Sequence, residues 1–273
     1  MSYFEAGVLG VVQGLTELLP ISSSGHLRIV PALAGWEDPG AAFTAVVQIG
    51  TVVAVLVYFR RDLWNITRTW TLSLWRPELR GTRDARLGWY IGLGTVPICV
   101  FGLVFQDQIE GPARNLWVVS TVLIAFAFVL LFADRVGRQE RDVENLTLRD
   151  GLIIGTAQSL ALVPGVSRSG ATITAGLLLG LKREAAARYA FLLSTPAIVL
   201  SGGFELRKIG DENTYGWGPT ILATLLAFLV GYATIGWLLR FVSTNSYVIF
   251  VVYRIALGTA LLTLLTAGVI SAT

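Results

Sequence analysis

The sequence predicts an all-α protein that crosses a membrane several times. Apolar residues make up 54% of its 273 residues and charged residues only 14%, a balance typical of polytopic membrane proteins. Six apolar stretches are long enough to cross about 30 Å of hydrocarbon as helices. They are residues 41–59, 87–105, 116–133, 186–203, 219–239 and 247–266. This pattern argues against a soluble fold.

Two further apolar stretches are too short to span a bilayer. Residues 4–19 and 151–163 break at Pro20 and Pro164, and serine and glycine follow each proline. Segments of this length, broken midway, favour two re-entrant helical hairpins, at 4–40 and 151–181, that enter the bilayer and leave on the same side. A full helix kinked at its proline is the alternative.

The arginines of the short loops predict the orientation. Seven lie between residues 60 and 86 and four between 134 and 150, against one between 106 and 115. The two arginine-rich loops are therefore expected in the cytoplasm. Alternation then opens the first hairpin to the outside and the second to the inside. Most basic residues lie in loops beside apolar spans and set the orientation, which accounts for the net charge of +3. We therefore expect no nucleic-acid partner.

The two broken segments resemble each other. "GVVQGLTELLPISSSGHL" aligns with "GTAQSLALVPGVSRSGAT" so that Gln13 pairs with Gln158 and Pro20 with Pro164. Each copy is one hairpin followed by three spans, which divides a single membrane domain, 1–273, into repeats 1–133 and 151–266. Three crossings per copy turn the second copy upside down, so the sequence predicts an inverted repeat whose hairpin tips meet near the midplane.

The predicted tips are rich in polar side chains. Ionisable groups at membrane depth are costly unless they are paired or hydrated, so Glu17, His26 and Arg168 are candidate functional residues. A structural alternative is that Glu17 and Arg168 only neutralise each other. The first tip carries Gln13, Glu17, Ser22, Ser23, Ser24 and His26, and the second carries Gly165, Ser167, Arg168, Ser169 and Thr172.

These residue types suit phosphate chemistry. Backbone N–H groups at open helix ends and glycine-flanked turns, such as that at Gly165, bind phosphate oxygens together with hydroxyls and the guanidinium of Arg168. Ser23 and His26 lie three residues apart and, with a nearby carboxylate, supply an activated nucleophile and a general base. His26 is the only histidine, which excludes two-histidine phosphatase chemistry and zinc held by a histidine cluster.

At this point the chain resembles a known family. "QGLTELLPISSSGH" and "PGVSRSGAT" are similar to the two signature motifs of the undecaprenyl-diphosphatase family, and the resemblance covers nearly the whole chain. It implies removal of the terminal phosphate from undecaprenyl diphosphate, a polyprenyl diphosphate lipid, to recycle the carrier of cell-wall precursors. It also implies a divalent cation (Mg²⁺ or Ca²⁺), a bacterial plasma membrane and an active site open to the outer face. Membrane enzymes of this kind often pair, so a homodimer is a possible assembly.

The resemblance also assigns roles to residues. Many members carry glutamate where this chain has Gln13, so Glu17 is the main carboxylate for a cation. We expect Ser23 to attack phosphorus, His26 to accept its proton, and Glu17 to orient His26 or to hold the cation. An alternative makes His26 the nucleophile. Serines and a histidine of the first motif match Ser22, Ser23 and His26, and the second motif places phosphate-binding groups at Ser167, Arg168, Ser169 and Thr172.

Two questions stay open at this level. Arg254 lies within the last span and is expected to face the protein interior, where it contacts the diphosphate or a carboxylate of a tip, or makes a structural contact between helices. Inverted repeats with broken segments also build secondary transporters. A transporter of an anionic lipid or a small anion is therefore the rival class, and the two motifs favour the enzyme.

Overall fold

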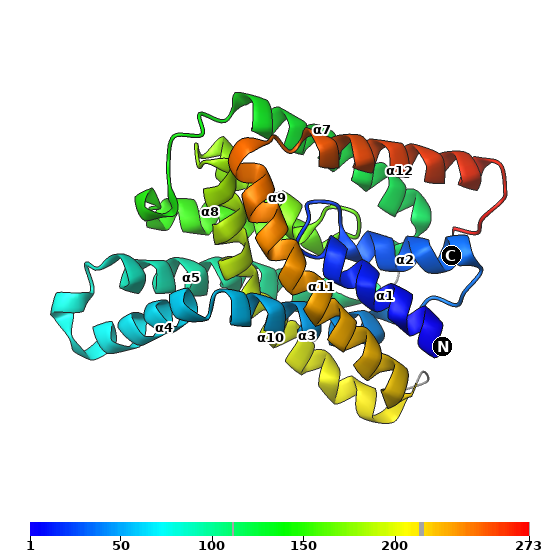
Figure 1. The fold of residues 1–273 in the computed structure, drawn as a ribbon, viewed down its shortest axis with the longest axis horizontal. Helices are drawn as coiled ribbons and strands as arrows, with labels where there is room; N and C mark the ends of the chain where they lie inside the picture. The colour runs from blue at the N-terminus through cyan, green and yellow to red at the C-terminus, as the bar shows by residue number, and fades with distance from the viewer. Residues whose placement is uncertain (111, 213–215, 273) are drawn as a thin grey trace.

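The computed structural model describes residues 1–110, 112–212 and 216–272 and is helical, with no strand in these ranges. Figure 1 shows the helices packed as one bundle. The α-helices are α1 (Tyr3–Thr16), α2 (Ser23–Ala34), α3 (Gly40–Tyr58), α4 (Arg60–Trp75), α5 (Arg83–Val104), α6 (Gln106–Glu110), α7 (Leu116–Val136), α8 (Leu148–Gln158), α9 (Arg168–Leu178), α10 (Arg183–Glu212), α11 (Trp217–Thr244) and α12 (Val248–Thr266). Short 3₁₀ helices are η1 (Pro77–Leu79), η2 (Pro112–Arg114), η3 (Val143–Asn145) and η4 (Ser159–Leu162).

Among the described residues, five helices are long and apolar enough to cross a membrane. They are α5, α7, α11, α12 and the Arg183–Gly203 part of α10. The remaining predicted span, residues 41–59, corresponds to α3, which qualifies only together with α4, and the two helices meet at a bend of 80°. The chain is therefore a multi-pass membrane protein with five spans, or six if the bent pair counts as one.

Helix α4 corrects the sequence prediction, which treated residues 60–86 as a loop. The buried residues of α4, Ile66 and Ser73, lie two turns apart on one face, and the helix packs on α5 (Figure 1). Trp70 contacts α5 at Gly88, where a Cβ atom would lie 2.6 Å from the Trp70 side chain. Trp64 and Trp75 are exposed. Such a helix, with arginines and tryptophans outside a narrow apolar face, is typical of a membrane interface.

Each broken segment forms two helices that fold back on each other. Helix α1 ends at Thr16 and α2 begins at Ser23, and the two lie side by side in Figure 1. At their open end the rings of Phe4 and Trp36 meet edge to face, with centroids 6.2 Å apart. The break falls around Pro20, since the residue before a proline is disfavoured in a helix.

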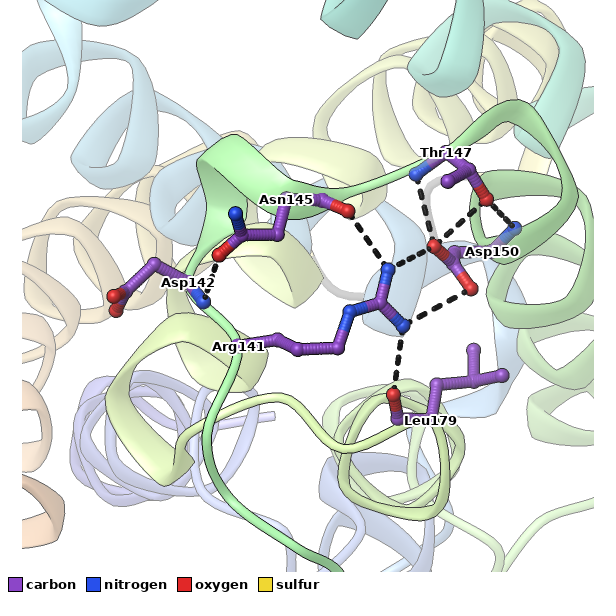
Figure 2. A network of polar contacts seen from close by, with 6 residues as sticks. All are labelled: Arg141, Asp142, Asn145, Thr147, Asp150 and Leu179. Atoms are coloured by element: carbon purple, nitrogen blue, oxygen red, sulfur yellow. Dashed lines mark hydrogen bonds and ion pairs between the residues drawn. The ribbon is translucent and has the colours of Figure 1, made fainter.

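The second pair, α8 and α9, is joined at its open end by a polar network around Arg141 (Figure 2). The guanidinium of Arg141 donates to the Asp150 carboxylate at 2.6 Å and to the Leu179 carbonyl at 2.8 Å. Asp150 lies in the first turn of α8, and Leu179 follows α9. Arg141 therefore holds the start of one helix beside the end of the other.

Glycine allows helix α8 to approach α5 closely. A Cβ atom at Gly155 would lie 2.2 Å from the Gly94 carbonyl oxygen, so no larger residue fits at this crossing without a backbone shift. The contact brings the second broken segment against a membrane-spanning helix. Elsewhere α11 packs on both α1 and α3, and α12 packs on α7 (Figure 1). Both broken segments are thus surrounded by spans.

We predict that the Arg141 network makes stability depend on pH. Burial raises the pKa of Asp150, but hydrogen bonds from Arg141 and Thr147 outweigh it and hold the pKa below its ordinary value of 3.8. The network therefore stabilises the fold above pH 3.8 and loses this contribution as the pH falls through the folded-state pKa. The gap in melting temperature between wild type and Asp150→Asn should be largest at pH 7 and shrink toward pH 3. A gap that does not change over this range would contradict the assignment.

Candidate active site

The two helix breaks contact each other directly. The backbone N–H of Gly165, in the second break, donates to Ser22 Oγ at 3.1 Å. Ser169 Oγ, at the start of α9, donates to the Leu19 carbonyl of the first break at 2.8 Å. The polar residues of both segments therefore belong to one buried site, as the sequence alignment of the two segments predicts for their tips.

Arg254 of α12 joins the two breaks. Its Nη1 donates to the Pro20 carbonyl at 3.0 Å and to the Val166 carbonyl at 3.1 Å, and its Nη2 donates to the Gly165 carbonyl at 2.7 Å. Its Nε donates to the Leu123 carbonyl of α7 at 3.1 Å. The side chain is fully buried. These contacts match the structural role that the sequence left open for Arg254.

In each pair, a serine with a positive φ angle directly precedes the second helix. Ser22 and Ser167 have φ values of 74° and 75°, in the left-handed region that residues other than glycine seldom occupy. Each side chain caps its helix by accepting from the N–H three residues later, at 3.3 Å in α2 and 3.1 Å in α9. Ser23 and Arg168 consequently occupy equivalent first positions of α2 and α9.

Glu17 and Ser23 form the central pair of the site. Ser23 Oγ donates to Glu17 Oε2 at 2.5 Å, and Gln13 Nε2 donates to the same oxygen at 2.9 Å. Gln48 Nε2 of α3 lies 3.5 Å away. Glu17 and Ser23 are both buried, so the carboxylate is the nearest proton acceptor for the hydroxyl. Gln48 was absent from the sequence prediction, although an amide within the apolar stretch 41–59 was the available signal.

His26 is placed differently from the sequence prediction. Its Nδ1 lies 2.7 Å from the Ser22 carbonyl and its Nε2 lies 2.7 Å from the Tyr253 hydroxyl. A carbonyl only accepts, so Nδ1 carries a hydrogen, and in the neutral imidazole Nε2 then accepts from the Tyr253 hydroxyl. Neither Ser23 nor Glu17 hydrogen-bonds His26 among the described contacts, which corrects the expected pairing. Tyr253 was missed because its contact with His26 is not local in sequence.

Arg168 has unsatisfied donors inside the site. It lines a small cavity together with Glu17 and Ser169. Its Nε and Nη1 atoms are buried and have no hydrogen-bond partner within the described ranges. No ion pair joins Arg168 to Glu17 in the part of the chain that the structure describes, so the two do not simply neutralise each other. A partly buried cation with two buried N–H groups that lack partners suits an anionic ligand.

The other predicted phosphate-binding residues mainly support the backbone. Thr172 Oγ1 donates to the Arg168 carbonyl at 2.8 Å, within its own helix. Ser24 Oγ lies 3.4 Å from Ser22 Oγ, and Ser167 Oγ lies 3.1 Å from Ser169 Oγ. These hydroxyls hold the two turns in place.

The site offers few ligands for a metal ion. The described residues contain no group of three or more His, Cys, Asp or Glu side chains that could hold one. Glu17 supplies a carboxylate, and the buried Oε1 of Gln13 accepts no hydrogen bond there. Mg²⁺ usually binds one or two carboxylates and completes its shell with water and substrate phosphates. The donor set therefore fits a cation that is shared with phosphate oxygens.

Fold and site together define a multi-pass membrane protein in which a buried serine and carboxylate share one site with a partly buried arginine. The family described as bacitracin resistance protein BacA matches residues 6–260, and the chain belongs to this family. A Nocardioides protein named undecaprenyl-diphosphatase is 58% identical over the full length of both chains. A Thermobifida fusca protein of the same name is 57% identical over 99% of this chain and 93% of its own. Undecaprenyl-diphosphatase 2 of Streptomyces coelicolor is 51% identical over 99% of this chain and 97% of its own.

We predict that Arg254 cannot be replaced by lysine without loss of stability. A lysine ammonium has three donors on one atom and cannot reach four carbonyls in different segments, and each buried carbonyl left unpaired costs about 1–3 kcal/mol. Arg254→Lys should therefore melt well below wild type in detergent. Arg240→Lys, at an exposed position of α11, is the matched control. Equal melting temperatures for the two variants would contradict the role of Arg254.

Proposed function

We propose that this protein hydrolyses undecaprenyl diphosphate to undecaprenyl phosphate and inorganic phosphate, and so returns the lipid carrier to bacterial cell-wall synthesis. The names of its full-length relatives support this function. The observation that carries it is the Ser23–Glu17 hydrogen bond beside the unpaired guanidinium of Arg168. A nucleophile, a proton acceptor and an anion-binding cation thus lie in one buried site.

The first step is attack by Ser23 on the terminal phosphorus. The Ser23 proton passes to Glu17, to which it is already hydrogen-bonded, an Oγ–P bond forms, and the bond from phosphorus to the bridging oxygen breaks. Undecaprenyl phosphate leaves. This assignment keeps the predicted nucleophile and replaces His26 by Glu17 as the base.

The second step is hydrolysis of the phosphoserine. Glu17 first gives up the proton it received from Ser23 to the departing undecaprenyl phosphate. It then takes a proton from water, the water oxygen attacks phosphorus, and the Oγ–P bond breaks. Glu17 returns this proton to Ser23 Oγ, which releases phosphate and restores Ser23. Arg168 and the N–H groups at the starts of α2 and α9 stabilise negative charge on the phosphate oxygens in both steps. Their donors are already in place before substrate arrives, which limits reorganisation.

A divalent cation, Mg²⁺ or Ca²⁺, forms part of this proposal. Glu17 and the Gln13 amide oxygen would hold it together with the diphosphate. When bound, it neutralises charge on the phosphate oxygens. Glu17 then serves both as a ligand and as the partner of Ser23.

His26 acts as a positioning residue in this mechanism. Its bond to the Ser22 carbonyl fixes the turn that places Ser23 at the start of α2. Its other nitrogen is held by Tyr253 of α12, beside Arg254. The ring therefore connects the first break to the helix that also holds both breaks together.

The proposal includes the predicted membrane topology. The equivalent caps at Ser22 and Ser167 support an inverted repeat, and the folded-back helix pairs support re-entrant hairpins that meet within the bilayer. The opening toward the outer face, the bacterial plasma membrane and the homodimer stay predictions of the sequence.

Phosphate release by purified protein tests the mechanism. With undecaprenyl diphosphate and Mg²⁺ in detergent, Ser23→Ala and Glu17→Gln should each lower kcat by about 10² or more. His26→Gln should lower it by less than about tenfold, because an amide N–H still donates to the Ser22 carbonyl.

Four outcomes would contradict parts of the proposal. Ser23→Ala that retains most of the turnover excludes the serine nucleophile, and a trapped phosphohistidine would assign that role to His26. A larger loss in His26→Gln than in Glu17→Gln would restore His26 as the base. Wild-type protein that binds the lipid but releases no phosphate would favour the transporter class.

A further inference from the structure

An apolar groove begins at Arg168 and lies between α5 and α10. Its volume is about 420 Å³, within the range of small-molecule pockets. Ile98, Cys99 and Gly102 of α5 line one side and Leu200 of α10 lines the other. Apart from Arg168, Gln106 and Ser201, its lining residues are nonpolar. None of the steps proposed above uses this groove.

Arg168 connects the groove to the site of chemistry. The same side chain lines the small cavity that Glu17 and Ser169 also line. Its buried Nε and Nη1 have no partner among the described residues. A ligand that satisfies these donors and also fills the groove needs an anionic group attached to an apolar chain.

Exposed leucines of both helices line the groove. Leu103 of α5 and Leu200 of α10 line it and are 66% and 57% exposed. On helices that cross a membrane, such exposed leucines contact lipid tails. A long chain held at Arg168 can therefore leave the protein sideways and continue among the lipids.

We propose that this groove binds the isoprene units next to the diphosphate, with the rest of the polyprenyl chain in the bilayer. The inference rests on the proposed function, because it takes the phosphates to be held by Arg168. Binding of these units aligns the terminal phosphate with Ser23, so chain length should matter near the diphosphate and little beyond the groove.

Gly102 offers a way to fill the groove without disturbing the helices. A Cβ atom there would lie 3.7 Å from Leu162 Cδ2, an ordinary van der Waals contact. Gly102→Leu should raise the KM for undecaprenyl diphosphate roughly tenfold and change hydrolysis of methyl diphosphate, which has no isoprene unit, by less than about twofold. Gly92→Leu is the matched control, since Gly92 lies on the same helix with no atom within 4 Å of its Cβ position. Equal effects of Gly102→Leu on both substrates, or none on either, would overturn the proposal.

Cys99 provides a second test that does not depend on turnover. It is the only cysteine of the chain and lines the groove, so a maleimide reports on this place alone. In phosphatidylglycerol nanodiscs, added undecaprenyl phosphate should slow alkylation of wild-type Cys99 several-fold, while inorganic diphosphate should not. Alkylation that is unchanged by undecaprenyl phosphate would overturn the proposal.

The two measurements separate failure of the groove from failure of the proposed function. Protection of Cys99 in a protein that releases no phosphate would leave the groove standing and reject the hydrolase. Phosphate release without protection of Cys99, and without the KM effect at Gly102, would reject the groove alone.

Discussion

The site depends on one buried arginine. Arg254 donates to carbonyls of both helix breaks and of α7, at a place where helix breaks leave backbone groups without helical partners. In the apolar interior of a membrane protein each unpaired carbonyl is costly, so the guanidinium makes it possible for two broken segments to meet there. The charged side chain of Arg254 therefore has a structural role. Among the described residues of the two breaks, Arg168 is then the cation with donors available to a ligand.

The two broken segments share the same backbone turn but differ in the side chain that follows it. In each segment a serine at positive φ caps the second helix, and in the proposed mechanism the next residue carries the chemistry. That residue is Ser23 in the first segment and Arg168 in the second. In the proposed mechanism, equivalent positions of the two segments thus supply a nucleophile and an anion-binding group, and neither segment alone supplies both.

Several residues that the structure brings together at the candidate site have local signals in the sequence. Proline after a short apolar run marks the breaks at Pro20 and Pro164, and polar side chains in apolar surroundings mark Glu17, Ser23 and Arg168. The pairing of Ser23 with His26 was wrong because it relied on spacing alone. Across the break, the chain brings Glu17 to Ser23, while the His26 ring reaches Tyr253 in α12. Helix α4 was missed because it is rich in arginine and its buried face is narrow. That face is recognised only from its packing against α5.

The central claim is that Ser23 of one segment and Arg168 of the other act on the same phosphate. A double-mutant cycle tests it most directly, with kcat/KM for phosphate release measured for Ser23→Ala, Arg168→Lys and the double variant. Residues that act as a unit lose their effects together, so the account predicts that the double variant is about as slow as the slower single variant. Losses that multiply, as for two independent sites, would contradict it.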